Sequence, residues 1–270
     1  MRVDILGSGS RGNALVIDAG DETGAVLVDC GFGPRILARR MKRAGIRPQD
    51  ISTVVVTHEH QDHVRGLGQA VRRWKWDVAA TEGTARATPG LATALTHRLA
   101  SGRRLRLAGL TVETLRTPHD ATESVGLIVT HERSGARLGV VYDLGHWTTS
   151  MAERLRGVDA LILEANHDEE MLQAGPYPAF LKQRVAGANG HLCNADAAAL
   201  ARTVMHRGLG TIVLAHLSEQ NNTPALALAT VRQALRGTGF RGGLRAAQQD
   251  GALHFEIGPA RRTRQLAFDL

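Results

Sequence analysis

Short apolar runs, separated by polar and glycine-containing segments, recur along the whole chain. Runs rich in β-branched residues are typical of buried strands, and apolar positions three or four residues apart are typical of helices. We expect strands at residues 2–6, 14–18, 25–29, 53–57, 77–80, 104–107, 110–115, 125–131, 137–142, 160–164 and 211–215. Helical patterns lie between many of these runs, so the chain is expected to be an α/β protein.

The expected helices are marked by capping residues as well as by apolar spacing. Pro34 lies in the first turn of a helix over 34–44, Asn194 is expected to cap a helix over 194–206, and Thr223 with Pro224 opens a last helix. Further helices are expected at 64–73, 82–87 and 169–174. The pair Asp250-Gly251 favours a closing β-hairpin.

Length and composition fit a globular protein. With 270 residues and 43% hydrophobic residues, the chain can bury a substantial core. We expect one domain over residues 1–258 and a basic tail over 259–270. The two cysteines give no disulfide framework, and the N-terminus enters a strand without a secretory pattern, so we expect a cytoplasmic location.

The formal net charge of +7 favours anionic partners such as DNA. Five basic residues lie on the expected helix over 34–44, where they form either a solvated face or a surface that follows phosphates. An arginine-rich composition without any nucleic-acid role explains the charge equally well, so charge alone does not decide between these two readings.

Candidate chemistry begins directly after the expected strand at 53–57. Three histidines and a carboxylate follow within six residues, as His58, His60, Asp62 and His63. Residues two apart on an extended segment point the same way, so His58 and His60 can hold one cation. Asp62 and His63 can face a second cation close by. Nitrogen and oxygen donors suit zinc, and they also accept manganese or iron.

The histidine motif, together with segments 7–13, 28–31, 117–120, 142–145, 166–172, 190–192 and 214–218, resembles the metallo-β-lactamase superfamily and its YycJ/WalJ-like branch. The resemblance implies a four-layer αββα sandwich with two divalent metal ions at one edge. It also implies a 5′-to-3′ exonuclease that acts on DNA. By the same resemblance, one ion is held by His58, His60 and His119, the other by Asp62, His63 and His216, and Asp143 bridges them.

Further site residues are expected around this set. Asp29 ends a strand and is expected to accept a hydrogen bond from a ligating imidazole. Asp62 is also expected to orient a hydroxide. His191 is expected to protonate the leaving oxygen or to stabilise a phosphate, unless backbone carbonyls satisfy it as an ordinary loop histidine.

Candidate substrate contacts are polar residues in loops near the motifs. The Gly/Ser/Asn loop over 7–13 suits an anion site, although a plain tight turn explains it as well. His167 lies either at the rim of the site or among helix-capping residues. The full set of expected substrate contacts is Ser8, Ser10, Asn13, His167, Ser218 and Asn221.

The last six residues resemble the bacterial motif that binds the sliding clamp. Leu266, Phe268 and Leu270 can fill an apolar groove while Gln265 fixes the register by hydrogen bonds. A packed terminus explains these residues as well. The leading hypothesis is therefore a two-metal DNA exonuclease. The alternatives are a phosphodiesterase or ester hydrolase acting on a small molecule, and a clamp-tethered DNA-binding protein whose metals are structural.

Overall fold

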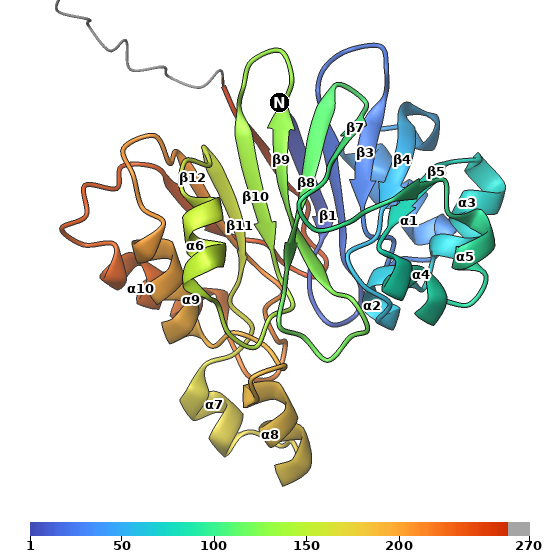
Figure 1. The fold of residues 1–270 in the computed structure, drawn as a ribbon. Helices are drawn as coiled ribbons and strands as arrows, with labels where there is room; N and C mark the ends of the chain where they lie inside the picture. The colour runs from blue at the N-terminus through green and yellow to red at the C-terminus, as the bar shows by residue number, and fades with distance from the viewer. Residues whose placement is uncertain (259–270) are drawn as a thin grey trace, which may run out of the picture.

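Two seven-stranded sheets pack face to face in the computed structural model, which describes residues 1–258 (Figure 1). The first sheet runs in the order β14-β1-β2-β3-β4-β5-β6 and the second in the order β13-β12-β11-β10-β9-β8-β7. The strands are β1 (Arg2–Gly7), β2 (Ala14–Asp18), β3 (Ala25–Val28), β4 (Ile51–Val55), β5 (Asp77–Ala80), β6 (His97–Arg98), β7 (Arg104–Leu107), β8 (Leu110–Arg116), β9 (Val125–His131), β10 (Arg137–Val141), β11 (Ala160–Glu164), β12 (Thr211–Ala215), β13 (Gly243–Ala246) and β14 (Leu253–Glu256).

Helices cover the outer face of each sheet. Buried side chains of α1, α3, α4 and α5 pack on the first sheet, and those of α6, α9 and α10 pack on the second. The helices are α1 (Pro34–Arg43), α2 (Gln61–Val64), α3 (Leu67–Trp74), α4 (Glu82–Ala87), α5 (Leu91–Ala94), α6 (Thr149–Leu155), α7 (Glu169–Ala174), α8 (Ala179–Ala186), α9 (Asn194–Thr203) and α10 (Pro224–Ala234). A third apolar cluster fills the space between the sheets. The expected four-layer sandwich is therefore confirmed.

Parallel pairing explains why functional side chains gather at one edge. Strands β3 and β4 are parallel, and so are β10, β11 and β12. Parallel neighbours deliver their carboxyl ends to the same edge of a sheet. Within residues 1–258, no helix combines the length and the apolarity needed to cross a bilayer.

Three local predictions are wrong. The closing hairpin does not form, because β13 pairs with β12 while β14 pairs with β1 in the other sheet. The helix expected over 64–73 is two helices, α2 and α3, because Gly66 donates its backbone N–H to the Cys30 carbonyl at 2.8 Å. The helix expected over 194–206 ends at Thr203, and its N-cap is Cys193, whose Sγ accepts a hydrogen bond from the Asp196 backbone.

Candidate metal centre

Seven side chains expected to bind metal lie together at the edge where β4, β10 and β12 end. The donor atoms within each of three groups lie within 4.8 Å of one another. The groups are His58, His60 and His119; Asp62, His63 and His216; and His58, His63 and Asp143. Residues separated by more than 150 positions in sequence therefore meet at one place, in the two sets of three that the family resemblance implies.

The backbone is turned sharply where these strands end. Asp29, Asp143 and His216 have φ values of 60°, 57° and 53°, in the left-handed region that non-glycine residues rarely adopt. Each residue follows a strand, and the left-handed turn directs its side chain into the cluster. Such conformations cost on the order of 1–2 kcal/mol and persist where the surrounding structure fixes them.

One nitrogen of each buried imidazole is held by the protein. His63 Nδ1 lies 2.8 Å from Asp29 Oδ2, His119 Nδ1 lies 2.9 Å from the Gly190 carbonyl, and His58 Nδ1 lies 3.1 Å from Thr57 Oγ1. The other nitrogen of each ring is left to face the cluster. This is the arrangement by which proteins fix the tautomer and direction of metal-binding histidines.

Asp29 is itself fixed by several donors. It accepts hydrogen bonds from the backbone N–H and hydroxyl of Thr57 and from the hydroxyl of Tyr142 at 2.8 Å, in addition to the contact with His63. Tyr142 lies directly before Asp143, so one hydrogen bond links the two sheets beneath the cluster. Asp29 thus lies where it can accept a hydrogen bond from an imidazole of the cluster.

Two buried polar atoms in the cluster, Nε2 of His58 and Oδ2 of Asp143, form no hydrogen bond, although His63 Nε2 lies 3.0 Å from the Asp143 oxygen. Burying an unpaired nitrogen is unfavourable, so His58 Nε2 needs a partner such as a cation. Asp143 Oδ2 has a further lone pair for a cation. The donor set of imidazoles and carboxylates fits a divalent metal ion.

The charge state of the cluster also fits cation binding. Burial and the neighbouring His63 hold the pKa of His58 well below its ordinary value. Burial lowers the pKa of His216, but Asp143 and Asp62 outweigh it and raise the pKa to about 10. Burial opposes ionisation of Asp143, yet the nearby His216 and His63 hold its pKa well below the ordinary value. Without cations, protons on His216 and His63 therefore balance the carboxylates, and bound cations would displace these protons.

Glu164 is a site residue that the sequence reasoning missed. It is fully buried at the end of β11, and its Oε1 lies 2.7 Å from His191 Nδ1 and 3.2 Å from His216 Nδ1. Its Oε2 accepts backbone hydrogen bonds from Leu144 and Leu192. The signal was available, because Glu164 closes an apolar strand in the same way as the histidines of the cluster.

A cavity of about 150 Å³ opens beside the cluster. It is lined by His191 and His216, by Ser10 and Ser218 among the expected substrate contacts, and by residues of α8. Burial lowers the pKa of His191, but the charge of Glu164 outweighs burial and raises it. The cavity therefore brings hydroxyl groups and the His191 imidazole to one side of the cluster.

The four other expected substrate contacts are buried within the protein. The Ser8 hydroxyl donates to Asn13 Oδ1 and accepts from the His216 backbone at 2.9 Å. Asn13 Nδ2 lies 3.2 Å from both Asp62 Oδ2 and His63 Nε2. Ser8 and Asn13 therefore hold residues of the cluster in position through hydrogen bonds.

His167 and Asn221 lie away from the cavity wall. His167 is 2% exposed, forms a β-bridge with Cys193, and is followed by Asp168, which caps α7. Asn221 is fully buried, and its carbonyl accepts the backbone N–H of Asp168. Both residues hold the segment that leads into α7, and neither reaches the cavity.

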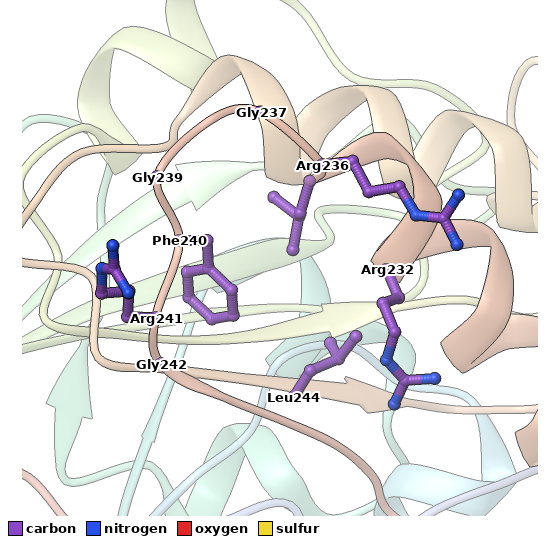
Figure 2. A pocket seen from close by; sticks show the side chains of 9 residues that line it. Arg232, Arg236, Gly237, Gly239, Phe240, Arg241, Gly242 and Leu244 are labelled. Atoms are coloured by element: carbon purple, nitrogen blue, oxygen red, sulfur yellow. The ribbon is translucent and has the colours of Figure 1, made fainter.

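A larger hollow, about 720 Å³, lies between α10 and β13 (Figure 2). The start of β13 pairs with the start of β12, so this hollow lies at the opposite end of β12 from His216. Figure 2 shows the guanidinium groups of Arg232 and Arg236 on one side of the Phe240 ring and that of Arg241 on the other. Its lining contains no histidine or carboxylate that could hold a metal.

Comparison with known proteins agrees with this fold. Residues 25–217 match the family model of the beta-lactamase superfamily domain. Exodeoxyribonuclease YycJ of Bacillus anthracis is 34% identical over 244 residues, which cover 89% of this chain and 91% of that protein. Exodeoxyribonuclease WalJ of Streptococcus pneumoniae serotype 2 is 30% identical over 237 residues, which cover 85% of this chain and 86% of that protein.

A solved structure extends the likeness of the fold to nearly the whole chain. The metallo-β-lactamase fold protein YhfI from Bacillus subtilis superposes with a TM-score of 0.69 at 16% identity, over 94% of this chain and 99% of that one. The chain belongs to the metallo-β-lactamase superfamily of hydrolases, in the branch that contains YycJ and WalJ.

Proposed function

We propose that this protein is a DNA exonuclease that hydrolyses phosphodiester bonds from the 5′ end and uses two divalent metal ions, zinc or manganese. The observation that carries the proposal is the convergence of two sets of three ligands on Asp143. The names of the YycJ and WalJ relatives, both exodeoxyribonucleases, support DNA as the substrate and an exonucleolytic mode. The formal charge of +7 favours the same anionic substrate.

The proposed metal ions would supply the hydrolytic chemistry, and residues of this chain would hold them in place. Two bound divalent cations would activate water near neutral pH and would neutralise negative charge on the phosphate. His58, His60 and His119 would hold one of them, and Asp62, His63 and His216 the other. Asp143 would touch both, since a carboxylate has enough lone pairs for two cations.

The proton for the leaving oxygen comes from His191 in this proposal. Its Nδ1 is held by Glu164 at 2.7 Å, so Nε2 is the nitrogen left to meet the substrate. Glu164 raises the pKa of His191, which favours the protonated ring that a general acid needs. Ser10 and Ser218 on the cavity wall would hydrogen-bond the non-bridging phosphate oxygens.

Labelled oligonucleotides test this proposal directly. The purified protein, with manganese or zinc added, should release mononucleotides from a 5′-labelled strand before internal fragments appear, and His60→Ala should not. Bis(p-nitrophenyl) phosphate serves as a small diester in parallel. Hydrolysis of the small diester without oligonucleotide cleavage would support the small-molecule alternative. DNA binding without any turnover would support the binding-protein alternative.

The sliding clamp is a second proposed partner, and it rests on the sequence alone. Gln265, Leu266, Phe268 and Leu270 lie outside the described residues. A peptide of residues 259–270 should bind a bacterial sliding clamp, and a peptide with Leu266 and Phe268 both replaced by alanine should not. Equal binding of the two peptides would remove the clamp from the proposal and leave the nuclease assignment unchanged.

A further inference from the structure

Helix α8 differs from the other helices because none of its residues is buried. Figure 1 shows α7 and α8 projecting beyond the two sheets. Phe180, in the first turn of α8, is 72% exposed, whereas Ile36 and Leu226, the other exposed large apolar residues in the described chain, are each 41% exposed. A phenylalanine exposed to this degree places most of its ring in water at an energetic cost.

The helix is fixed against the candidate metal centre at its C-terminal end. Its last turn leads into the loop that carries His191, whose backbone N–H donates to the Val185 carbonyl at 2.9 Å. A Cβ atom on Gly190 would lie 2.2 Å from the carbonyl oxygens of Arg184 and Val185, so only glycine permits this close approach. The helix and the loop of the proposed general acid therefore form one continuous structure.

Side chains of α8 also form part of the cavity wall. Leu181, Arg184 and Val185 line the cavity that contains His191 and His216. Arg184 Nε donates to Asp120 Oδ2 at 2.6 Å, and Asp120 directly follows His119. Helix α8 thus forms one side of the cavity beside the cluster.

Phe180 lies on the same helical face as Arg184, one turn earlier. Residues four apart on a helix are neighbours on its surface. Arg184 reaches the cavity, so Phe180 extends the same face outward from the cavity mouth. Tyr177, which precedes the helix, also lines the cavity. An aromatic and cationic surface therefore continues outward from the place where the proposed scissile phosphate would lie.

We propose that this face of α8 binds unpaired DNA, with a nucleobase next to the scissile phosphate stacked on the Phe180 ring. The proposal rests on the proposed nuclease function and specifies its substrate as a single-stranded end. Aromatic rings accept any base by its face, and positive side chains follow the backbone. Arg184 places a guanidinium one helical turn from the ring, where it also pairs with Asp120. A base inside a duplex has no free face, so a paired end must fray before it can bind.

A single-stranded nucleic acid fits this surface better than a second protein chain does. A stable interface between protein chains buries about 800 Å² on each partner. Here the exposed apolar surface centres on one ring, and the other exposed large apolar residues of the described chain lie on α1 and α10. One ring matches the area of one base.

Phe180→Ala is the test, with Leu226→Ala as the matched control on α10. Phe180→Ala should raise KM for a single-stranded oligonucleotide about 10-fold to 100-fold, while Phe180→Trp should keep the wild-type value. Hydrolysis of bis(p-nitrophenyl) phosphate should be unchanged in all three variants, since Phe180 and Leu226 lie outside the cavity lining. An abasic site near the 5′ end should weaken binding to the wild type and should cause no further loss in Phe180→Ala.

The outcomes separate this inference from the nuclease assignment. If the wild type cleaves oligonucleotides and Phe180→Ala matches Leu226→Ala, the stacking proposal is overturned and the nuclease assignment stands. If the wild type neither binds nor cleaves oligonucleotides, the proposed function itself fails. If Phe180→Ala instead converts a dimer into a monomer in sedimentation measurements while KM stays constant, the face is an interface between protein chains and the proposal is overturned.

Discussion

Two hollows at opposite ends of β12 show what distinguishes a reactive site from a surface depression. The hollow beside α10 measures about 720 Å³ and is lined by arginines, glycines, Phe240 and two leucines. The cavity beside His216 measures about 150 Å³, yet His191 and His216 in its lining belong to groups of converging metal-binding side chains. Size therefore does not identify the site here. The candidate site is identified by convergent polar groups whose imidazoles are held by hydrogen bonds to Asp29 and Glu164.

Of the substitutions that test this comparison, replacement of Asp143 should have the largest effect on the rate of hydrolysis. Asp143→Ala should lower hydrolysis at least about 1,000-fold, because it removes the carboxylate proposed to touch both cations. The number of metal ions bound per chain, measured by mass spectrometry of the metal content, should fall as well. Asp143→Asn and circular dichroism control for folding. Activity within tenfold of the wild type would show that this cluster does not catalyse the hydrolysis.

Removing the charge of Glu164 should have a smaller effect. Glu164→Gln keeps the shape of the side chain but weakens its hold on His191, so we expect about a 10-fold to 100-fold loss in kcat. Because the carboxylate raises the pKa of His191, the alkaline limb of the pH–rate profile should also move to lower pH. An unchanged profile would show that Glu164 acts only in packing.

The metal-free protein should have an unusual dependence of stability on pH. Glu164 has its pKa lowered to about 2 from 4.5, because His191 outweighs burial, so its contribution of about 3 kcal/mol is lost as the pH falls from 4.5 toward 2. His216 has its pKa raised from 6.5 to about 10, so its contribution is complete below pH 6.5 and is lost as the pH rises toward 10. The combined contribution of Glu164 and His216 should therefore be greatest between about pH 4.5 and 6.5, whereas the lowered pKa of His58 removes stability as the pH falls below 6.5.

Urea unfolding in the presence of a chelator measures this dependence. Glu164→Gln should flatten the acidic limb and should leave most of the alkaline limb. A free energy of unfolding that increases steadily from pH 5.5 to pH 9 would contradict the charge balance inferred for the cluster. Zinc should reduce the alkaline loss, because cations replace the protons on the histidines.

The arginine hollow should give the smallest effects. Arg232→Ala and Arg236→Ala replace exposed side chains, so we expect stability within about 0.5 kcal/mol of the wild type. Hydrolysis of bis(p-nitrophenyl) phosphate should stay within about twofold. A tenfold loss in either variant would show that the larger hollow takes part in the chemistry.

Local sequence patterns predicted most strands and the histidine motif, because both depend on residues close together in the chain. The strands at 14–18, 77–80, 160–164 and 211–215 have the predicted bounds. The failed hairpin near Asp250 shows the limit of such patterns. A turn and two short apolar runs do not reveal that the runs pair with β12 and β1 in different sheets.

The candidate site was predictable where a residue follows an apolar strand, and it was less predictable where tertiary contacts decide. Of the expected substrate contacts, Ser10 and Ser218 line the cavity, whereas Ser8 and Asn13 are buried against the cluster. All four lie in similar small-residue loops, and only the packing of the two sheets determines which side chains face outward. Phe180 had no sequence signal, because an isolated phenylalanine in a short helix is normally a core residue.

The central claim is that seven side chains hold two cations, and a crystal structure of the manganese-loaded protein with anomalous scattering tests it most directly. The account predicts two anomalous peaks about 3.5–4 Å apart, one beside His58, His60 and His119 and the other beside Asp62, His63 and His216, with Asp143 between them. A single peak, or manganese bound only outside these residues, would contradict it.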